Sequence, residues 1–492
     1  MNGQPRTATP AGNDLAIRSL PIATIAVIAA NVVALVAFAC SPIGTEYPLI
    51  ALGIVAFILV QAFLPACRLR PDLPLCPTNL AQGFYCVQLV LVSVLIGHTG
   101  FSQGTLPYMP GKSAIDTATL VHIAGYLSFS GAFQWFSRGK ETAHQPGTST
   151  PERSGAPYMI VPFFLIGTLG FFLNYGSIGA FIEYATTPSA HRAALSEPAT
   201  METALASFLK HFLGFSVVLA WSWWIGSAKG PRSTRVTGLV TIGACLLMII
   251  ANFSYNRGTM FGPILCMGAA FSVHVWRIPF KGVALAGVGL LACAFAFGAY
   301  RSSDDGELPS ARGRDTMESA SFIEFVQIYA SAPQLPAYYI EHLEHEDRFY
   351  LGSTIVPSIL YPIPVLGKPH REKSGVYLFN ELIYGDPEVL DQIIPFDTEM
   401  YLNFHLPGIM LGNLVLGALL SFYQRKFLTA ANPAESYAWC MFALWTVFPG
   451  SLPVIVQVFV YSFLPIYVYL FAKKFWPSSN VMAEAPAHRS GA

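Results

Sequence analysis

Long apolar runs recur along almost the whole chain and predict a series of membrane-spanning helices. A run of about 18 or more apolar residues is long enough to cross a bilayer as a helix, and we read about twelve such runs. They cover residues 20–41, 47–66, 79–98, 114–135, 158–176, 203–227, 235–252, 258–275, 282–300, 406–424, 434–450 and 452–472. The last two are the hardest to separate, because turn-forming residues are dense between them. The pattern predicts an all-α polytopic membrane protein.

One long polar stretch, residues 301–405, interrupts this pattern. It holds 17 of the chain's 28 acidic residues but only 7 of its 28 basic residues. The expected organisation is therefore a disordered tail 1–19, nine spans within 20–300, the large loop 301–405 with short helices, three spans within 406–474, and a disordered tail 475–492.

Composition supports a membrane protein and excludes other classes. The chain is 53% hydrophobic and 11% charged, with a mean hydropathy of +0.49, whereas soluble domains carry about 25% charged residues. Its net charge of zero gives no sign of nucleic-acid binding. The 8 cysteines lie in or near apolar runs and indicate neither a disulfide framework nor a CxxC metal pair.

The distribution of basic residues predicts that both termini are cytoplasmic and that the large loop lies outside. With this orientation, 17 of the 28 basic residues are cytoplasmic and 7 lie in the large loop. Short cytoplasmic loops normally carry the excess of lysine and arginine. Outside the large loop, only four basic residues are then predicted on the outer side, namely Lys112, Arg192, Lys210 and Arg257.

Candidate chemistry lies where arginines meet the predicted outer membrane surface. Arg192 follows the fifth span, Arg257 lies in the turn before the eighth, and Arg301 lies where the ninth span ends. Arginine suits a diphosphate because its planar fork donates two parallel hydrogen bonds and stays charged. The alternative for each is a side chain that only snorkels to the lipid headgroups. Arg257 is the strongest candidate, because Gly258 lets the backbone approach a ligand.

The end of the large loop adds further candidates. They are Lys368, His370 and Arg371 in a basic cluster, and Asp397, Glu399 and His405 at the junction with the span 406–424. A half-buried carboxyl such as that of Glu399 is desolvated, which raises its pKa towards that of a general base. The alternative is an exposed acid in an acidic loop.

Two histidine pairs are also notable. His342 and His345 lie among glutamates but lack HExxH spacing, and a polar surface helix explains them better than a metal site. Lys210 and His211 form an ionisable pair near the outer end of the sixth span. Ionisable residues at membrane depth are functional candidates, although snorkelling also explains Lys210.

Several short motifs follow one another along the second half of the chain. In order they are Gly176-Ser-Ile-Gly-Ala-Phe with a downstream arginine, Asn256-Arg257-Gly258, Arg301, Tyr350-Leu-Gly-Ser-Thr-Ile-Val-Pro357, Pro362-Ile-Pro-Val-Leu-Gly-Lys-Pro369, and Glu399-Met-Tyr-Leu-Asn-Phe followed by Pro407-Gly408. Their order, together with the late outer loop, resembles that of the Wzy-type oligosaccharide repeat-unit polymerases, which are related to O-antigen ligases. The resemblance covers residues 160–425. The chain departs from the family at His405, where a glycine is common, and near Val365, where an arginine is frequent.

The resemblance implies a GT-C-like membrane glycosyltransferase at the periplasmic face of a bacterial inner membrane. It would join undecaprenyl-diphosphate-linked oligosaccharides without metal or cofactor, because the lipid diphosphate is itself the leaving group. Arg257 and Arg301 would neutralise that diphosphate, and Glu399 would accept the acceptor's proton. The expected partners are the lipid-linked oligosaccharides, the bilayer and a chain-length regulator. The residues expected to bind substrate are Arg192, Lys368, His370, Arg371, Asp397 and His405.

Two alternatives remain at this point. An O-antigen ligase would hand the glycan to a lipid A core by the same chemistry. A transporter or flippase for lipid-linked sugars predicts polar residues buried in the middle of the spans and two related halves, whereas the charge here gathers at one predicted surface.

Overall fold

All the regular elements that the structure describes are helices. The computed structural model describes residues 21–103, 106–138, 157–186, 201–226, 234–253, 257–279, 281–283, 326–327, 332–346, 350–361, 367–384, 394–447 and 452–475, with a few single residues between them. Within these ranges there is no strand. The prediction of an all-α protein is therefore confirmed.

Helices in the first part of the chain coincide with the predicted apolar runs. They are α1 (Ile22–Ala39), α3 (Pro48–Phe63), α6 (Lys112–Ser137), α7 (Pro157–Tyr175), α10 (Met201–Gly226), α11 (Thr234–Ala251) and α12 (Arg257–His274). The run 79–98 becomes α4 (Pro77–Cys86), the π turn η2 (Val87–Leu91) and α5 (Val92–Thr99). Shorter elements are α2 (Pro42–Glu46), η1 (Pro65–Cys67) and α8 (Ile178–Thr186). Proline starts α2, α3 and α4, where its missing N–H is not needed.

The later part of the chain contains short loop helices followed by three apolar segments. The loop elements are α16 (Gln334–Glu346), α17 (Ile355–Leu360), the 3₁₀ turn η4 (Lys368–Lys373) and α18 (Gly375–Tyr384). The apolar segments are α19 (Phe396–Leu428), α20 (Pro433–Val447) and a broken segment of α21 (Leu452–Gln457), the π turn η5 (Val458–Ser462) and α22 (Leu464–Phe475). The broken segment bends by 52°.

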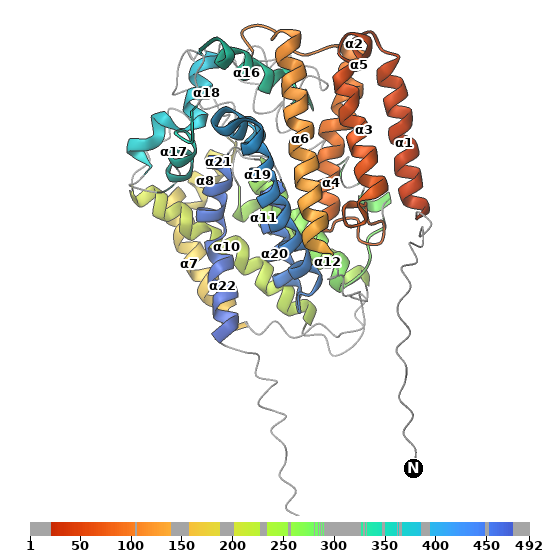
Figure 1. Ribbon diagram of the computed structural model, residues 1–492. Helices are drawn as coiled ribbons and strands as arrows, with labels where there is room; N and C mark the ends of the chain where they lie inside the picture. The colour runs from red at the N-terminus through yellow and green to blue at the C-terminus, as the bar shows by residue number, and fades with distance from the viewer. Residues whose placement is uncertain are drawn as a thin grey trace, which may run out of the picture.

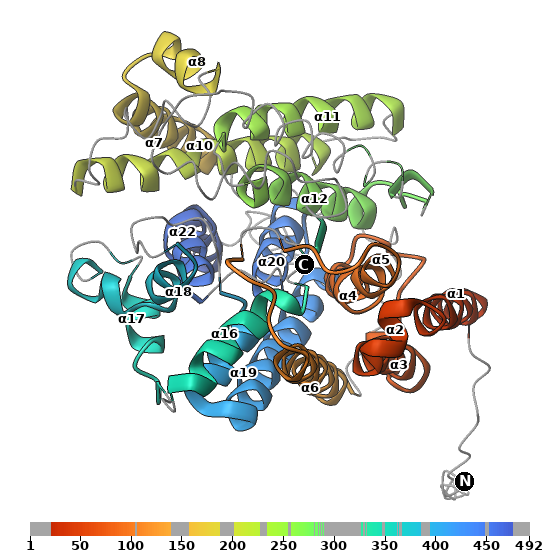
Figure 2. The same cartoon turned by 90° about the horizontal axis from the view of Figure 1, so that it is seen from above.

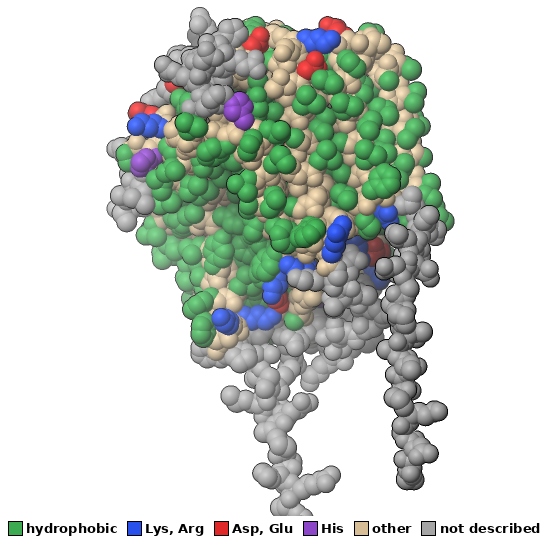
Figure 3. Space-filling model, viewed as in Figure 1, with side chains coloured by type: hydrophobic (Ala, Val, Ile, Leu, Met, Phe, Trp, Pro, Cys, Tyr) green, Lys and Arg blue, Asp and Glu red, His purple; other side chains and the backbone are tan. Residues whose placement is uncertain are grey.

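Several of these helices are long and apolar enough to cross a membrane. In the described part of the chain there are 5, namely α1, α4–α5, α7, α10 and α19, or 6 if the bent segment counts as one span. In α1 only 17% of the apolar window is buried, so its apolar side chains face outward, as lipid contact requires. Figure 3 shows hydrophobic side chains covering the side of the molecule, with charged side chains near its two ends. The protein is thus an all-helical membrane protein.

Helix α20 occupies the middle of the bundle, whereas α19 lies towards its outside, next to α6 and α16 (Figures 1 and 2). Helix α6 packs against α19, α12 packs against α20, and α7 pairs with α10. Gly167 and Gly170 of α7 face the backbone of α10, where a Cβ atom would collide with Leu213 or Leu209. Helices α16, α17 and α18 lie at one end of the bundle, and the start of α1 and the end of α22 lie at the other (Figure 1).

Glutamine side chains fasten the large loop to the short connection between α5 and α6. Gln327 accepts a hydrogen bond from the backbone of Ser102 at 2.9 Å and donates to the carbonyl of Gly100 at 2.9 Å. Gln334 of α16 donates to Gln327 at 3.0 Å and to the carbonyl of Ser102 at 3.2 Å. These segments therefore lie at the same end of the bundle.

Candidate functional site

Helix α19 reverses its direction at His405. This residue has φ 55° and ψ −150°, a conformation that residues other than glycine rarely adopt. Asn413 Nδ2 nevertheless donates to Asp397 Oδ1 over 2.7 Å, although the two residues are 16 positions apart. A straight helix would separate them by about 24 Å. Residues 396–404 therefore fold back along the rest of α19, and we call them the folded-back arm.

Small residues make room for the arm. A Cβ atom on Gly408 would lie 2.6 Å from the carbonyl oxygen of Met400, and one on Gly412 would lie 3.0 Å from the ring of Phe396. Pro407 lacks a backbone N–H, so the bend costs no hydrogen bond at that position. The sequence predicts that this segment enters the membrane at Leu406. In the structure, the acidic residues before the bend instead lie beside residues that follow the bend.

The arm places Asp397 between α6 and the rest of α19. His122 Nδ1 of α6 lies 3.3 Å from Asp397 Oδ2, and the Asp397 side chain is 13% exposed. Gly125 of α6 leaves space for the carboxyl, because a Cβ atom there would lie 2.8 Å from Oδ2. A carboxyl this deeply buried needs polar partners. His122 and Asn413 provide them.

A cavity, which we call the Asp397 cavity, adjoins this pair. It has a volume of about 30 Å³, enough for a few water molecules. Its lining combines the carboxyl, imidazole and amide groups with aromatic rings. The residues are Phe84, Tyr85, Gln88, His122, Phe129, Pro395, Phe396, Asp397, Asn413, Leu416, Thr446, Val447 and Ile455.

Two polar atoms of this lining have no hydrogen-bond partner among the described residues. They are Nε2 of His122 and Oε1 of Gln88. Gln88, only 7% exposed, lies in the π turn η2, and such turns often mark functional positions in helices. Leaving a buried polar atom unpaired costs about 1–3 kcal/mol, so both atoms favour a ligand or water at this place.

Glu399 points to a different side of the arm and is fully buried. Its Oε1 accepts hydrogen bonds from Ser358 Oγ of α17 at 2.7 Å and from Thr354 Oγ1 at 3.5 Å. The backbone N–H of Leu452 faces the same carboxyl but does not complete a hydrogen bond to Oε2, which has no partner in the described part of the chain. Asn403 donates to Thr354 Oγ1 at 2.7 Å and accepts from the backbone of Gly352 at 2.9 Å. Hydroxyl and amide groups thus surround Glu399.

This network joins the arm to the helices of the large loop. The backbone N–H of Gly375, the first residue of α18, donates to Ser358 Oγ at 3.2 Å. A Cβ atom on Gly375 would lie only 2.8 Å from Glu399 Oε1. The short turn η4, which contains Lys368, His370 and Arg371, contacts both α17 and α18. The turn that carries the predicted basic cluster therefore packs against the same loop helices that contact Glu399.

The other predicted arginines cannot be placed around this site. Arg192 and Arg301 lie outside the described residues. Arg257 is the first residue of α12, but its side chain is not described, and the same holds for Lys368 and Arg371. The proposed binding of a diphosphate by arginines stays a prediction.

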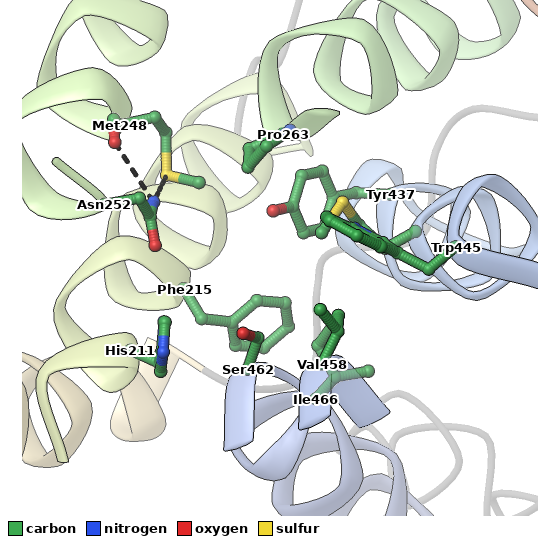
Figure 4. A pocket seen from close by; sticks show the side chains of 11 residues that line it. His211, Phe215, Met248, Asn252, Pro263, Tyr437, Trp445, Val458, Ser462 and Ile466 are labelled. Carbon is green, nitrogen blue, oxygen red and sulfur yellow. Dashed lines mark hydrogen bonds between the residues drawn. The ribbon is translucent and has the colours of Figure 1, made fainter. Parts of the chain in front are cut away.

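A second cavity, the His211 cavity, has Tyr437 and Trp445 of α20 in its wall (Figure 4). Polar groups of His211, Asn252 and Ser462 reach it from α10, the end of α11 and η5, and the rest of its wall is mainly apolar and aromatic. The neighbouring Lys210 lies with Nζ 5.7 Å from the ring centroid of Tyr175, a cation–π contact. Of the predicted ionisable pair, only His211 lines the cavity.

Three of the residues around Asp397 escaped prediction. His122, Gln88 and Asn413 each lie inside an apolar run, and none was singled out as a candidate. The available signal was their polarity within a predicted span, which favours a functional position. The partner of each could not be derived, because the bend at His405 creates the contacts.

The described fold and site define an all-helical membrane protein with polar groups buried beneath one end of its bundle. Comparison with protein-family models, with curated proteins and with solved structures finds no match. The site itself must therefore carry the functional argument.

Proposed function

We propose that this protein polymerises undecaprenyl-diphosphate-linked oligosaccharide repeat units at the periplasmic face of a bacterial inner membrane. In this proposal it is a GT-C-like glycosyltransferase with about twelve spans, and residues 301–405 face the periplasm. The observation that carries the proposal is the folded-back arm, which holds two carboxyls inside the bundle directly beneath the loop helices. A transfer between lipid-linked sugars needs such acidic groups close to the polar loop yet shielded from water.

The Asp397 cavity has the composition expected of a sugar-binding surface. Carboxyl, amide and imidazole groups bind hydroxyls by hydrogen bonds. Aromatic rings such as those of Tyr85 and Phe129 form the apolar part of the cavity wall. A purely lipid-facing groove would not need the carboxyl of Asp397.

The arginines supply the electrostatic part of the proposed reaction. Arg257 and Arg301, helped by Arg192 and Arg371, neutralise the charge that develops on the departing diphosphate, which is the kind of stabilisation that lowers a barrier most. Lys368 and His370 contribute to binding the substrate. Glu399 is the predicted proton acceptor on the strength of its motif.

The proposal is tested in a strain that depends on this protein for its surface polysaccharide. Arg257→Ala, at normal abundance in the membrane, is expected to leave single repeat units and no long chains, because loss of one charge-stabilising contact costs about 10²–10³-fold in rate. The matched control is Arg277→Ala, an exposed arginine beyond the other end of α12. Normal chain length in the Arg257 variant would remove the assignment, and glycan found only on lipid A core would identify a ligase.

A further inference from the structure

We propose that His122 is the catalytic base of this glycosyl transfer and that Asp397 orients it. The group it deprotonates is a hydroxyl of the acceptor sugar, entering the Asp397 cavity. The inference rests on the proposed function and deepens it, because it names a residue outside every motif and the part of the substrate that this residue meets.

The geometry of the pair sets the tautomer of His122. Its Nδ1 lies 3.3 Å from Asp397 Oδ2, so the ring proton belongs on Nδ1 and the lone pair on Nε2 is left to accept a proton. Asn413 holds the other carboxyl oxygen at 2.7 Å. With both oxygens engaged, Asp397 cannot easily turn away. A carboxyl that fixes a histidine in this way is the usual partner of a histidine base.

The unpaired atoms of the cavity indicate the chemical class of the ligand. His122 Nε2 and Gln88 Oε1 are both acceptors and both lack a partner among the described residues. A ligand that satisfies them must bring donors, and the hydroxyl groups of a sugar are such donors. Because the cavity measures only about 30 Å³, room for a few water-sized groups, only the hydroxyl-bearing edge of the sugar enters it.

The step balances without any further reactant. The acceptor oxygen forms a bond to C1 of the donor sugar, and the bond between C1 and the diphosphate oxygen breaks, with its electron pair leaving on undecaprenyl diphosphate. The acceptor's proton passes to His122 Nε2, which becomes a cation beside Asp397. That cation then releases its proton to the departing diphosphate or to water, and the pair returns to its starting state.

Glu399, which its motif predicts to be the proton acceptor, is placed differently, and we assign that role to His122 instead. Its carboxyl accepts hydrogen bonds from Ser358 and Thr354 and lines neither of the two cavities. Its surroundings suit a residue that holds α17 against the arm. The two carboxyls can therefore be separated by experiment.

The test compares purified full-length variants in the elongation of lipid-linked repeat units. In His122→Asn, the amide takes the place of Nδ1 beside Asp397, but no base remains at the position of Nε2. We expect kcat to fall by about 10²–10⁴-fold, with KM changed by less than about threefold and an unchanged unfolding temperature. Asp397→Asn is expected to lower kcat as well, and the double variant to be no slower than His122→Asn, because residues that act as a unit are not additive.

The matched control is His274→Asn. His274 also bridges two packed helices, with Nε2 2.7 Å from Ser436 Oγ, and its loss is expected to leave kcat within about twofold of the wild type. His122→Gln serves where His122→Asn does not fold.

The outcomes separate the inference from the function beneath it. No elongation by the wild-type protein would refute the proposed function. Elongation by the wild type together with near-normal kcat in His122→Asn or His122→Gln would overturn the inference alone. Loss of elongation in Glu399→Gln, with the His122 variants active, would assign the catalytic base to Glu399 and not to His122.

Discussion

Replacing His405 by glycine and, separately, by alanine tests the backbone on which the folded-back arm depends. The values φ 55° and ψ −150° cost a residue with a side chain about 1–3 kcal/mol. Glycine avoids this cost but loses about 0.5–1 kcal/mol relative to alanine through its freer unfolded chain. The glycine variant should therefore be more stable than the alanine variant by about 1 kcal/mol. In an ordinary helix interior the order is reversed by a similar amount.

The comparison cancels the loss of the imidazole ring. Both variants lack the ring of His405, which packs edge-on against Tyr401 with centroids 5.1 Å apart. The free energy of unfolding is measured on the purified protein in detergent by tryptophan fluorescence. The same pair of substitutions at Leu411, an exposed position in the straight part of α19, should show alanine as the more stable. The same order at His405 would refute the assigned bend.

Four further substitutions probe the site and the loop, with Gly131→Ala as the control for Gly125→Ala. Gly125→Ala brings a Cβ atom to 2.8 Å from Asp397 Oδ2 and should lower the free energy of unfolding by about 1–3 kcal/mol and shorten the polysaccharide. Gly131→Ala, with nothing within 4 Å, should gain up to about 1 kcal/mol. Ser358→Ala removes a 2.7 Å donor from buried Glu399 and should cost about 1–3 kcal/mol in denaturant unfolding. Gln327→Leu should speed proteolysis within 301–405, because it breaks the bonds that fasten α16.

Each of these expectations has a result that contradicts it. Equal effects of alanine at Gly125 and Gly131 would mean that the arm does not press against α6. An unchanged stability in Ser358→Ala would show that Glu399 is held by other groups. A cleavage rate in Gln327→Leu equal to that of the wild type would mean that Gln327 does not fasten the large loop to the connection between α5 and α6.

The helices could be predicted because their signal is local. A run such as 235–252 is mostly apolar, and the structure has α11 at Thr234–Ala251. Residues that favour the start of a helix, such as Pro157 at the beginning of α7, also give a local signal. The sequence did not show which of these runs form helices long enough to cross the membrane. The described part of the structure has five or six such candidate spans.

The site could be predicted only in part, because its contacts are not local. Asp397 and Glu399 stood out as acids next to a span, and both are hydrogen-bonded, with Glu399 fully buried and Asp397 13% exposed. Their partners lie on α6, α17 and the far side of a bend whose central residue is a histidine. No pattern in a single sequence predicts that a histidine takes a conformation favoured by glycine.

The two carboxyls of the arm connect the large loop to the Asp397 cavity. Positions two apart on a helix differ by about 200°, so Asp397 and Glu399 face nearly opposite sides of the arm. On one side Glu399 binds Ser358, next to the turn that carries the predicted basic cluster. On the other side Asp397 lies against His122. The contact of Glu399 with α17 and the contact of Asp397 with His122 are therefore joined through less than one turn of helix.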